Sequence, residues 1–175
     1  MDTSNNTKIS KLVLLYFFDN MEIPLTENTI VESCCSKNQW INYITCREIM
    51  IDLVDTGFVL KTTKNKEDYY SITGEGRDCL SYFFAKIPTS LRDEISSYVK
   101  ENRIMFKRKQ EYRTTYEQNT DGSYLVILRI VEPLGTQLEL KINVANRKQA
   151  KDACKRWEEK ASEVYASIYN ILIDD

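Results

Sequence analysis

Apolar residues recur every three or four positions near the start of the chain, which is the pattern of an amphipathic helix. This stripe consists of Ile9, Leu12, Val13, Tyr16 and Phe17. It predicts a first helix over about residues 7–20. Pro24 interrupts the pattern because proline cannot continue a helix. We expect Thr26 to cap a second helix over roughly residues 27–35.

A second patterned segment, from Thr45 to Gly76, reads as helix, strand, polar turn, strand and the start of another helix. Thr45 and Glu48 have the spacing of a capping box, so we predict that a third helix begins at Thr45. Gly57 lies where a left-handed residue would end this helix. Two strands are expected at residues 58–60 and 69–73, with a polar turn at residues 61–68 between them.

The order of these elements indicates a known architecture. Trp40 and Ile41 predict a short strand ahead of the third helix, and Thr73 is positioned to cap a fourth helix that runs to about Ile87. Three helices followed by a two-stranded hairpin are typical of a winged helix-turn-helix, which we expect over residues 1–86. The hairpin would be the wing.

The rest of the chain, residues 87–175, predicts a second domain. A helix from about Pro88 should lead into a three-stranded antiparallel meander and then a long C-terminal helix, so the fold class is α+β. The strands are expected at residues 109–118, 124–131 and 138–144, with turns at 119–122 and 133–135, and the closing helix at 147–173.

The middle strand of this meander is apolar on both faces, which favours a central position with a cover on each side. The closing helix can cover only one face. The second cover would come from the helix at Pro88 or from a second chain, and we expect a homodimer. The second domain would then have a dimerisation or sensor role.

Composition narrows the possible chemistry. Histidine is absent, which removes the commonest general base and metal ligand. The five glycines are scattered, so there is no glycine-rich phosphate loop. Neighbouring carboxylates such as Glu67 and Asp68 are expected to be solvated surface charges. We therefore expect no enzyme activity, no catalytic residue, no metal site and no cofactor.

The 175 residues are 42% apolar, which is enough for a core. The longest apolar run, residues 12–18, is far shorter than the roughly 20 residues of a bilayer span, and the polar first residues lack a signal-peptide pattern. We expect a cytoplasmic protein with no membrane partner. The five cysteines have no Cys-x-x-Cys spacing and are expected to be buried, reduced thiols, with redox sensing by Cys34 and Cys35 left open.

Several short motifs also occur in a family-like order: Lys11-Leu12, Pro24-Leu25-Thr26, Asn42-Tyr43, Ile72-Thr73-Gly74-Glu75-Gly76, Lys86-Ile87-Pro88, Cys154 and Trp157. Through them nearly the whole chain resembles an uncharacterised bacterial winged-helix family, known only as a domain of unknown function. This resemblance implies a transcriptional regulator with no established ligand or operator.

A winged helix most often places the second helix of its helix-turn-helix in a groove of double-stranded DNA. The candidate DNA-binding residues lie around the third helix and on the wing: Asn42, Tyr43, Thr45, Arg47, Lys61, Lys64 and Lys66. Arg47 is the natural guanine or phosphate partner on a helix that also carries Asp52 and Asp55. The leading hypothesis is a DNA-binding transcriptional regulator.

Charge keeps two alternatives open. The whole chain has a net charge of -2, and residues 1–86 have nine basic against twelve acidic residues. The first alternative is a winged helix that binds a protein partner through Ile51 and its acidic neighbours. The second is a regulator whose C-terminal domain senses a small molecule. No pattern identifies the operator, the effector or the sign of regulation.

Overall fold

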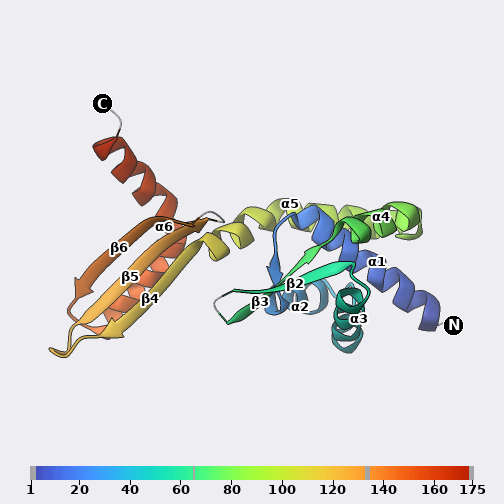
Figure 1. Cartoon of the computed structure of the whole chain (residues 1–175), viewed down its shortest axis with the longest axis horizontal. Coiled ribbons are helices and arrows are strands. Elements are labelled where there is room, and N and C mark those ends of the chain that lie inside the picture. Colours follow the sequence, from blue (N-terminus) through green and yellow to red (C-terminus); the bar gives the residue numbers. More distant parts are fainter. Residues whose placement is uncertain (1–2, 65, 133–134, 174–175) are drawn as a thin grey trace. The chain divides into compact units, whose positions relative to one another are not determined.

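The computed structural model describes residues 3–64, 66–132 and 135–173, which form a mixed α+β protein (Figure 1). These residues contain six α-helices and two three-stranded antiparallel sheets. The chain divides into two compact units, Met1–Arg103 and Ile104–Asp175. The division falls inside helix α5 (Thr89–Glu111), so most of that helix belongs to the first unit.

The first unit contains a helical group and a small sheet. Its elements are α1 (Thr3–Met21), β1 (Leu25–Thr26), α2 (Glu27–Val31), the π-helix η1 (Glu32–Lys37), α3 (Tyr43–Asp55), β2 (Val59–Lys64), β3 (Glu67–Ile72), α4 (Gly74–Phe83), the 3-10 turn η2 (Phe84–Lys86) and most of α5. The strand order in its sheet is β1-β3-β2, with both pairings antiparallel.

Helix α1 forms the centre of the first unit. It contacts α3, α4 and β3, and seven of its apolar side chains are at most 6% exposed. These side chains are Leu12, Val13, Leu14, Leu15, Phe17, Phe18 and Met21. A helix that is buried on more than one side needs apolar residues beyond a single stripe, which explains the run from Leu12 to Phe18.

Helix α5 completes this unit through polar and aromatic contacts. Its Ser96 shares a hydrogen bond of 2.8 Å with Tyr16 of α1, and its Glu94 accepts one of 2.9 Å from the indole of Trp40. Arg103 pairs with Glu22, the residue that follows α1. The apolar side of α5 is closed by Ile95 and Val99, both of which are almost fully buried.

Three local expectations for the first unit are wrong, and the first concerns α3. This helix begins at Tyr43, because Asn42 is its N-cap and the Asn42 Oδ1 accepts a hydrogen bond of 3.0 Å from the Thr45 amide. Thr45 therefore lies inside the first turn and does not start a capping box with Glu48. Asparagine is at least as good an N-cap as threonine, so residue preference alone does not favour Thr45 over Asn42.

The second correction concerns the strand expected at Trp40 and Ile41. The first strand is instead β1, whose Leu25 and Thr26 pair with Tyr70 and Tyr69 of β3. The Ile41 amide donates a hydrogen bond to the carbonyl of Cys34, which holds this segment against η1. The helix expected over residues 27–35 is α-helical only to Val31 and continues as η1.

The third correction is the length of the hairpin. The expected polar turn, residues 61–68, is largely paired, since β2 extends to Lys64 and β3 begins at Glu67. Cross-strand polar contacts support this ladder: the Thr63 hydroxyl donates to Asp68 over 2.6 Å. Polar side chains on both strands made the ladder resemble a loop.

The junctions around α4 confirm the expected caps. Gly57 has a φ of 77°, the left-handed conformation expected after α3. Thr73 caps α4, because its hydroxyl oxygen accepts a hydrogen bond of 3.1 Å from the Gly76 amide. The same hydroxyl donates to the Gly57 carbonyl over 2.8 Å. One threonine thus joins the end of α3 to the start of α4.

The second unit confirms the expected meander. Its strands are β4 (Tyr112–Gln118), β5 (Tyr124–Glu132) and β6 (Gly135–Val144), in the order β4-β5-β6, and α6 (Arg147–Leu172) follows. The turn after β4 contains Gly122 at a φ of 86°, as expected. The next turn is expected at residues 133–135, after β5, and its residues 133 and 134 lie outside the described residues.

Helix α6 covers one face of this sheet, and its C-terminal turns extend past the strands (Figure 1). The core between them consists of Val126, Leu128, Ile130, Ala150, Trp157 and Ala161. The Trp157 indole also donates to the Arg129 carbonyl over 3.1 Å. On the other face of the central strand β5, Leu125, Ile127 and Val131 are only partly buried, so the described residues of one chain do not cover that face completely, and a cover from a second chain stays a prediction.

Candidate nucleic-acid interface

Helix α3 has one face in the core and one face in solvent. Cys46, Ile49, Met50 and Leu53 are at most 5% exposed and pack inward. The outward residues are Tyr43, Ile44, Arg47, Glu48, Ile51 and Asp55. Their exposure follows directly from the helical period, because they alternate with the buried set. This outward face of α3 is therefore open to solvent.

Arg47 is held by two neighbours. Its Nη1 donates to the Tyr43 hydroxyl over 3.1 Å and lies 2.8 Å from the Glu27 carboxylate. The hydrogen bond to Tyr43 and then the charge of Glu27 raise the pKa of Arg47. The guanidinium is 5.9 Å from the centre of the Tyr43 ring. The structure therefore brings two of the predicted residues, Tyr43 and Arg47, into contact and places an acid of α2 beside them.

The starts of α1 and α3 form a polar groove. A cavity of about 250 Å³ is lined by Asn6, Thr7, Ser10, Trp40, Ile41, Asn42 and Thr45. Two predicted site residues, Asn42 and Thr45, thus share one groove with polar side chains of α1. Amide and hydroxyl groups of this kind commonly contact phosphate oxygens in protein–DNA complexes.

The three lysines of the hairpin differ in their surroundings. Lys61 lies 2.8 Å from the Asp68 carboxylate and 5.9 Å from the centre of the Tyr70 ring. The hydrogen bond between Lys61 and Asp68 raises the pKa of Lys61 and lowers the pKa of Asp68. Lys64 and Lys66 are exposed at the hairpin tip, and neither forms an ion pair within the described part of the chain.

Lys66 has a φ of 66°, the left-handed conformation of a tight turn. Lys64 ends β2 opposite Glu67, the first residue of β3. The hairpin tip therefore carries two exposed ammonium groups, whereas Lys61 is partly neutralised by Asp68 nearer to its base. Of the three predicted wing residues, Lys61 is thus paired with an acid, whereas Lys64 and Lys66 are exposed cations that could contact a partner.

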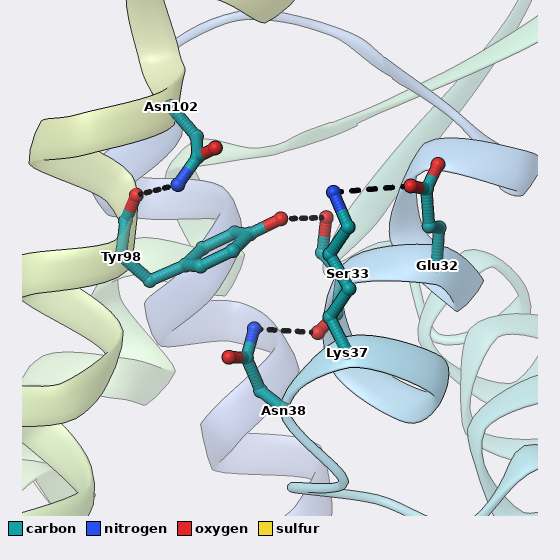
Figure 2. Close-up of polar contacts among 6 residues, drawn as sticks. All are labelled: Glu32, Ser33, Lys37, Asn38, Tyr98 and Asn102. Carbon is teal, nitrogen blue, oxygen red and sulfur yellow. Dashed lines mark hydrogen bonds and ion pairs between the residues drawn. The ribbon is translucent and has the colours of Figure 1, made fainter.

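A polar network holds η1, which precedes α3, against α5 (Figure 2). The Tyr98 hydroxyl of α5 donates to the hydroxyl of Ser33, which is fully buried, over 2.9 Å. The Asn38 side chain donates to the Ser33 carbonyl over 2.8 Å, and Lys37 pairs with Glu32 over 3.1 Å. A buried hydroxyl with a partner favours one arrangement of the segment that leads into α3.

Aromatic packing supports the same segment. The Trp40 ring makes edge contacts with Phe17 and Tyr98, with ring centres 6.0 and 5.5 Å apart. Sequence reasoning did not find this arrangement, and it also missed Glu27 as the partner of Arg47. No local pattern could have indicated either one, because the partners lie on separate elements.

The thiols near α3 are poorly suited to redox chemistry. Burial raises the pKa of Cys34 well above its usual value, and burial together with neighbouring Cys35 raises that of Cys46 to about 12. Burial also raises the pKa of the partly exposed Cys35. Since the thiolate is the reactive form, a raised pKa lowers the reactive fraction of each thiol near neutral pH. In the described residues, no three acidic, cysteine or histidine side chains are arranged to hold a metal ion.

These observations define a mixed α+β protein with an exposed helix and hairpin in its first unit and a helix-covered meander in its second. The chain belongs to the family described as "Domain of unknown function (DUF4364)", which spans residues 10–172 and therefore includes both units. No curated protein and no solved structure matches the chain. Across the residues that the structure describes, none of the helices combines the length and the apolar character needed to span a bilayer.

Proposed function

We propose that the first unit is a winged helix-turn-helix that binds double-stranded DNA, and that the protein is a transcriptional regulator. The observation that carries this proposal is the order α1, β1, α2, α3, β2, β3 with the sheet order β1-β3-β2, combined with a solvent-facing α3. In such domains the last helix before the hairpin enters the major groove.

Each exposed group then has a role in the proposed complex. Tyr43 and Arg47 approach base edges from the first turns of α3, and Ile44 offers an apolar surface for a thymine methyl group. Asn42 and Thr45 bind backbone phosphate from the polar groove. To bind DNA, Arg47 must give up its ion pair with Glu27. Breaking this pair reduces the free energy that the contact between Arg47 and DNA contributes to binding.

The two available cations of the wing, Lys64 and Lys66, supply backbone contacts in this proposal. Loss of these contacts weakens binding to every sequence about equally, because phosphates carry no sequence information. Each phosphate contact contributes about 0.9 to the slope of log affinity against log salt concentration. The double substitution Lys64→Gln/Lys66→Gln should therefore reduce this slope by about 2.

The measurement is fluorescence anisotropy with mixed-sequence duplexes at several salt concentrations. Lys148→Gln/Lys151→Gln removes the same charge from exposed positions of α6 and serves as the control. The control should keep the slope of the unsubstituted protein. Absence of duplex binding at low salt would reject DNA binding as the function.

A second candidate function is binding to a protein partner. It is favoured by the apolar groups on the outer surface of α3 and β2, where Ile44, Ile51 and Leu60 are 67%, 63% and 53% exposed, respectively. Neighbouring apolar groups in solvent often mark protein–protein contacts. The acidic Glu48 and Asp55 on the same helix would favour a basic partner.

We also propose that the second unit dimerises. Two features support this proposal: the partly exposed face of β5 and the apolar C-terminal turns of α6, where Ile171 and Leu172 are 78% and 73% exposed. A two-fold dimer would present two copies of α3 to a palindromic operator. Ligand sensing by the second unit stays a prediction.

A further inference from the structure

We propose that a cavity in the first unit, of about 370 Å³, binds a small carboxylic acid with an aliphatic body. The cavity lies among α1, the end of α3, α4 and η2. It is a different site from the proposed DNA interface, and the proposal does not depend on DNA binding.

The floor of the cavity is apolar. Leu12 and Leu15 of α1 and Leu53 of α3 line it, and each is at most 6% exposed. Phe58 and Phe83 form further walls, with Phe83 44% exposed. An aliphatic chain that displaced water from these side chains would gain hydrophobic free energy in proportion to the apolar area covered.

The rim of the cavity is cationic. It contains three ammonium groups, those of Lys8, Lys11 and Lys86, and one carboxylate, that of Asp52. The Lys11 Nζ lies 2.6 Å from the Asp52 Oδ2, so this pair neutralises one positive charge. Lys8 and Lys86 remain without an ion pair within the described residues. The excess of positive charge favours an anionic head group over a neutral or cationic one.

The ring of Phe83 holds the Lys86 side chain at the cavity. Its Nζ lies 4.8 Å from the centre of the Phe83 ring, which is the distance of a cation–π contact. Phe83 also lines the cavity, so the ammonium stands where the apolar wall meets solvent. A carboxylate bound there would meet Lys86 while its chain contacted Phe83.

The volume limits the class of ligand. Sites for small molecules usually measure about 300–1,000 Å³ and combine an apolar lining with a few polar groups. At about 370 Å³ this cavity is at the lower end, which suits a single medium-length aliphatic chain better than a nucleotide or a coenzyme. Together the floor, the rim and the volume point to a medium-chain carboxylate.

Binding would alter the contact between α1 and α3. A ligand carboxylate competes with Asp52 for Lys11, and Asp52, Leu53 and Thr56 all belong to the end of α3. A ligand can shift a structure only through a difference in contacts between two states, and this exchange of ion pairs supplies one.

Isothermal titration of the full chain with decanoate tests the site. Decanoate should bind one to one, whereas acetate lacks the chain and decyltrimethylammonium has the wrong charge, so both should bind far more weakly. Lys8→Gln/Lys86→Gln should weaken decanoate binding by about two- to thirtyfold, the range for loss of two exposed ion pairs. Both lysines are exposed, so the variant should keep its circular dichroism spectrum.

A matched control removes the same charge elsewhere. Lys100 and Lys109 of α5 are exposed and do not line the cavity, so Lys100→Gln/Lys109→Gln should bind decanoate as the unsubstituted chain does. Equal weakening in both double variants would reject the rim as the binding site. Tighter binding of decyltrimethylammonium than of decanoate, or no binding of decanoate, would reject the proposed ligand class.

Cysteine alkylation locates the ligand. Cys79 lines the cavity and is partly exposed, whereas the partly exposed Cys154 lies in the second unit. Decanoate should slow the reaction of Cys79 with iodoacetamide and leave that of Cys154 unchanged, as measured by peptide mass spectrometry. Equal rates at Cys79 with and without bound decanoate would overturn the assignment of this cavity.

Discussion

Gly76 shows how one residue can determine the junction between the hairpin and α4. A Cβ atom at this position would lie 2.3 Å from the Phe58 carbonyl oxygen and 2.9 Å from the Ile72 side chain. The first of these contacts is with backbone, which cannot rotate away. Glycine is therefore required by a close approach of two chain segments, although its own φ is ordinary.

The substitution Gly76→Ala should destabilise the protein by about 1–3 kcal/mol, the usual cost of forcing an extra carbon into a packed site. The measurement is the free energy of unfolding from urea titration. Gly74→Ala is the matched control, because a Cβ there meets nothing within 4 Å. The control should be neutral or slightly stabilising, since alanine restricts the unfolded chain. Equal stability of the two variants would contradict the close approach at Gly76.

Residue identity predicted the caps at Thr73 and Gly57, but it did not predict the N-cap of α3 or the partners of the charged side chains. Thr73 and Gly57 are chosen by local backbone conformation, so their roles could be predicted from the sequence. Arg47 was correctly expected on α3, but its pairing with Glu27 depends on how α2 packs beside α3. Such pairing between elements has no signal in a single sequence.

At the scale of elements, the helices with a strong apolar period were predicted and the short pieces were not. Helices α1, α3 and α6 each carry enough buried residues to show the period, so only their ends differ from expectation. Strand β1 has two residues, too few for any alternation to be visible. It exists because β3 offers a free edge for pairing.

The outer face of α3 distinguishes the two candidate functions. Ile51→Lys places a positive charge where the side chain is 63% exposed, so the fold should be retained. DNA affinity should rise severalfold, because one more cation faces the phosphates. Binding to a protein through this apolar surface should instead be weakened. Duplex binding by fluorescence anisotropy measures the difference.

Glu48→Lys is an informative companion to Ile51→Lys, since it also adds positive charge to the exposed face but keeps the apolar group. Both variants should bind duplex more tightly if α3 lies against DNA. A fall in duplex affinity for both would show that α3 is not the surface that meets DNA.

At the scale of the whole molecule, the family match includes both units, so their combination is a property of the family as well as of this chain. The C-terminal turns of α6 carry Tyr169, Ile171, Leu172 and Ile173, each at least 44% exposed. Exposed apolar groups gathered at one end of a helix can mark a protein–protein contact. The proposed dimer would bury them.

The double substitution Ile171→Glu/Leu172→Glu should convert the proposed dimer into a monomer, because two carboxylates would have to be buried without partners. Light scattering coupled to size exclusion, at several protein concentrations, measures the mass. Ser167→Glu/Asn170→Glu adds the same charge at exposed positions of α6 and should leave the dimer intact. A monomeric unsubstituted protein at high concentration would contradict dimerisation.

Helix α5 has a practical consequence for work with fragments. The boundary between the two compact units lies after Arg103, within a helix that has no loop at that point. A fragment cut after Lys86 would lose Ile95 and Val99 from its core and leave the Ser33 hydroxyl without Tyr98. An isolated first unit must therefore include the chain through Arg103, and its new end would be a helix terminus in need of a cap.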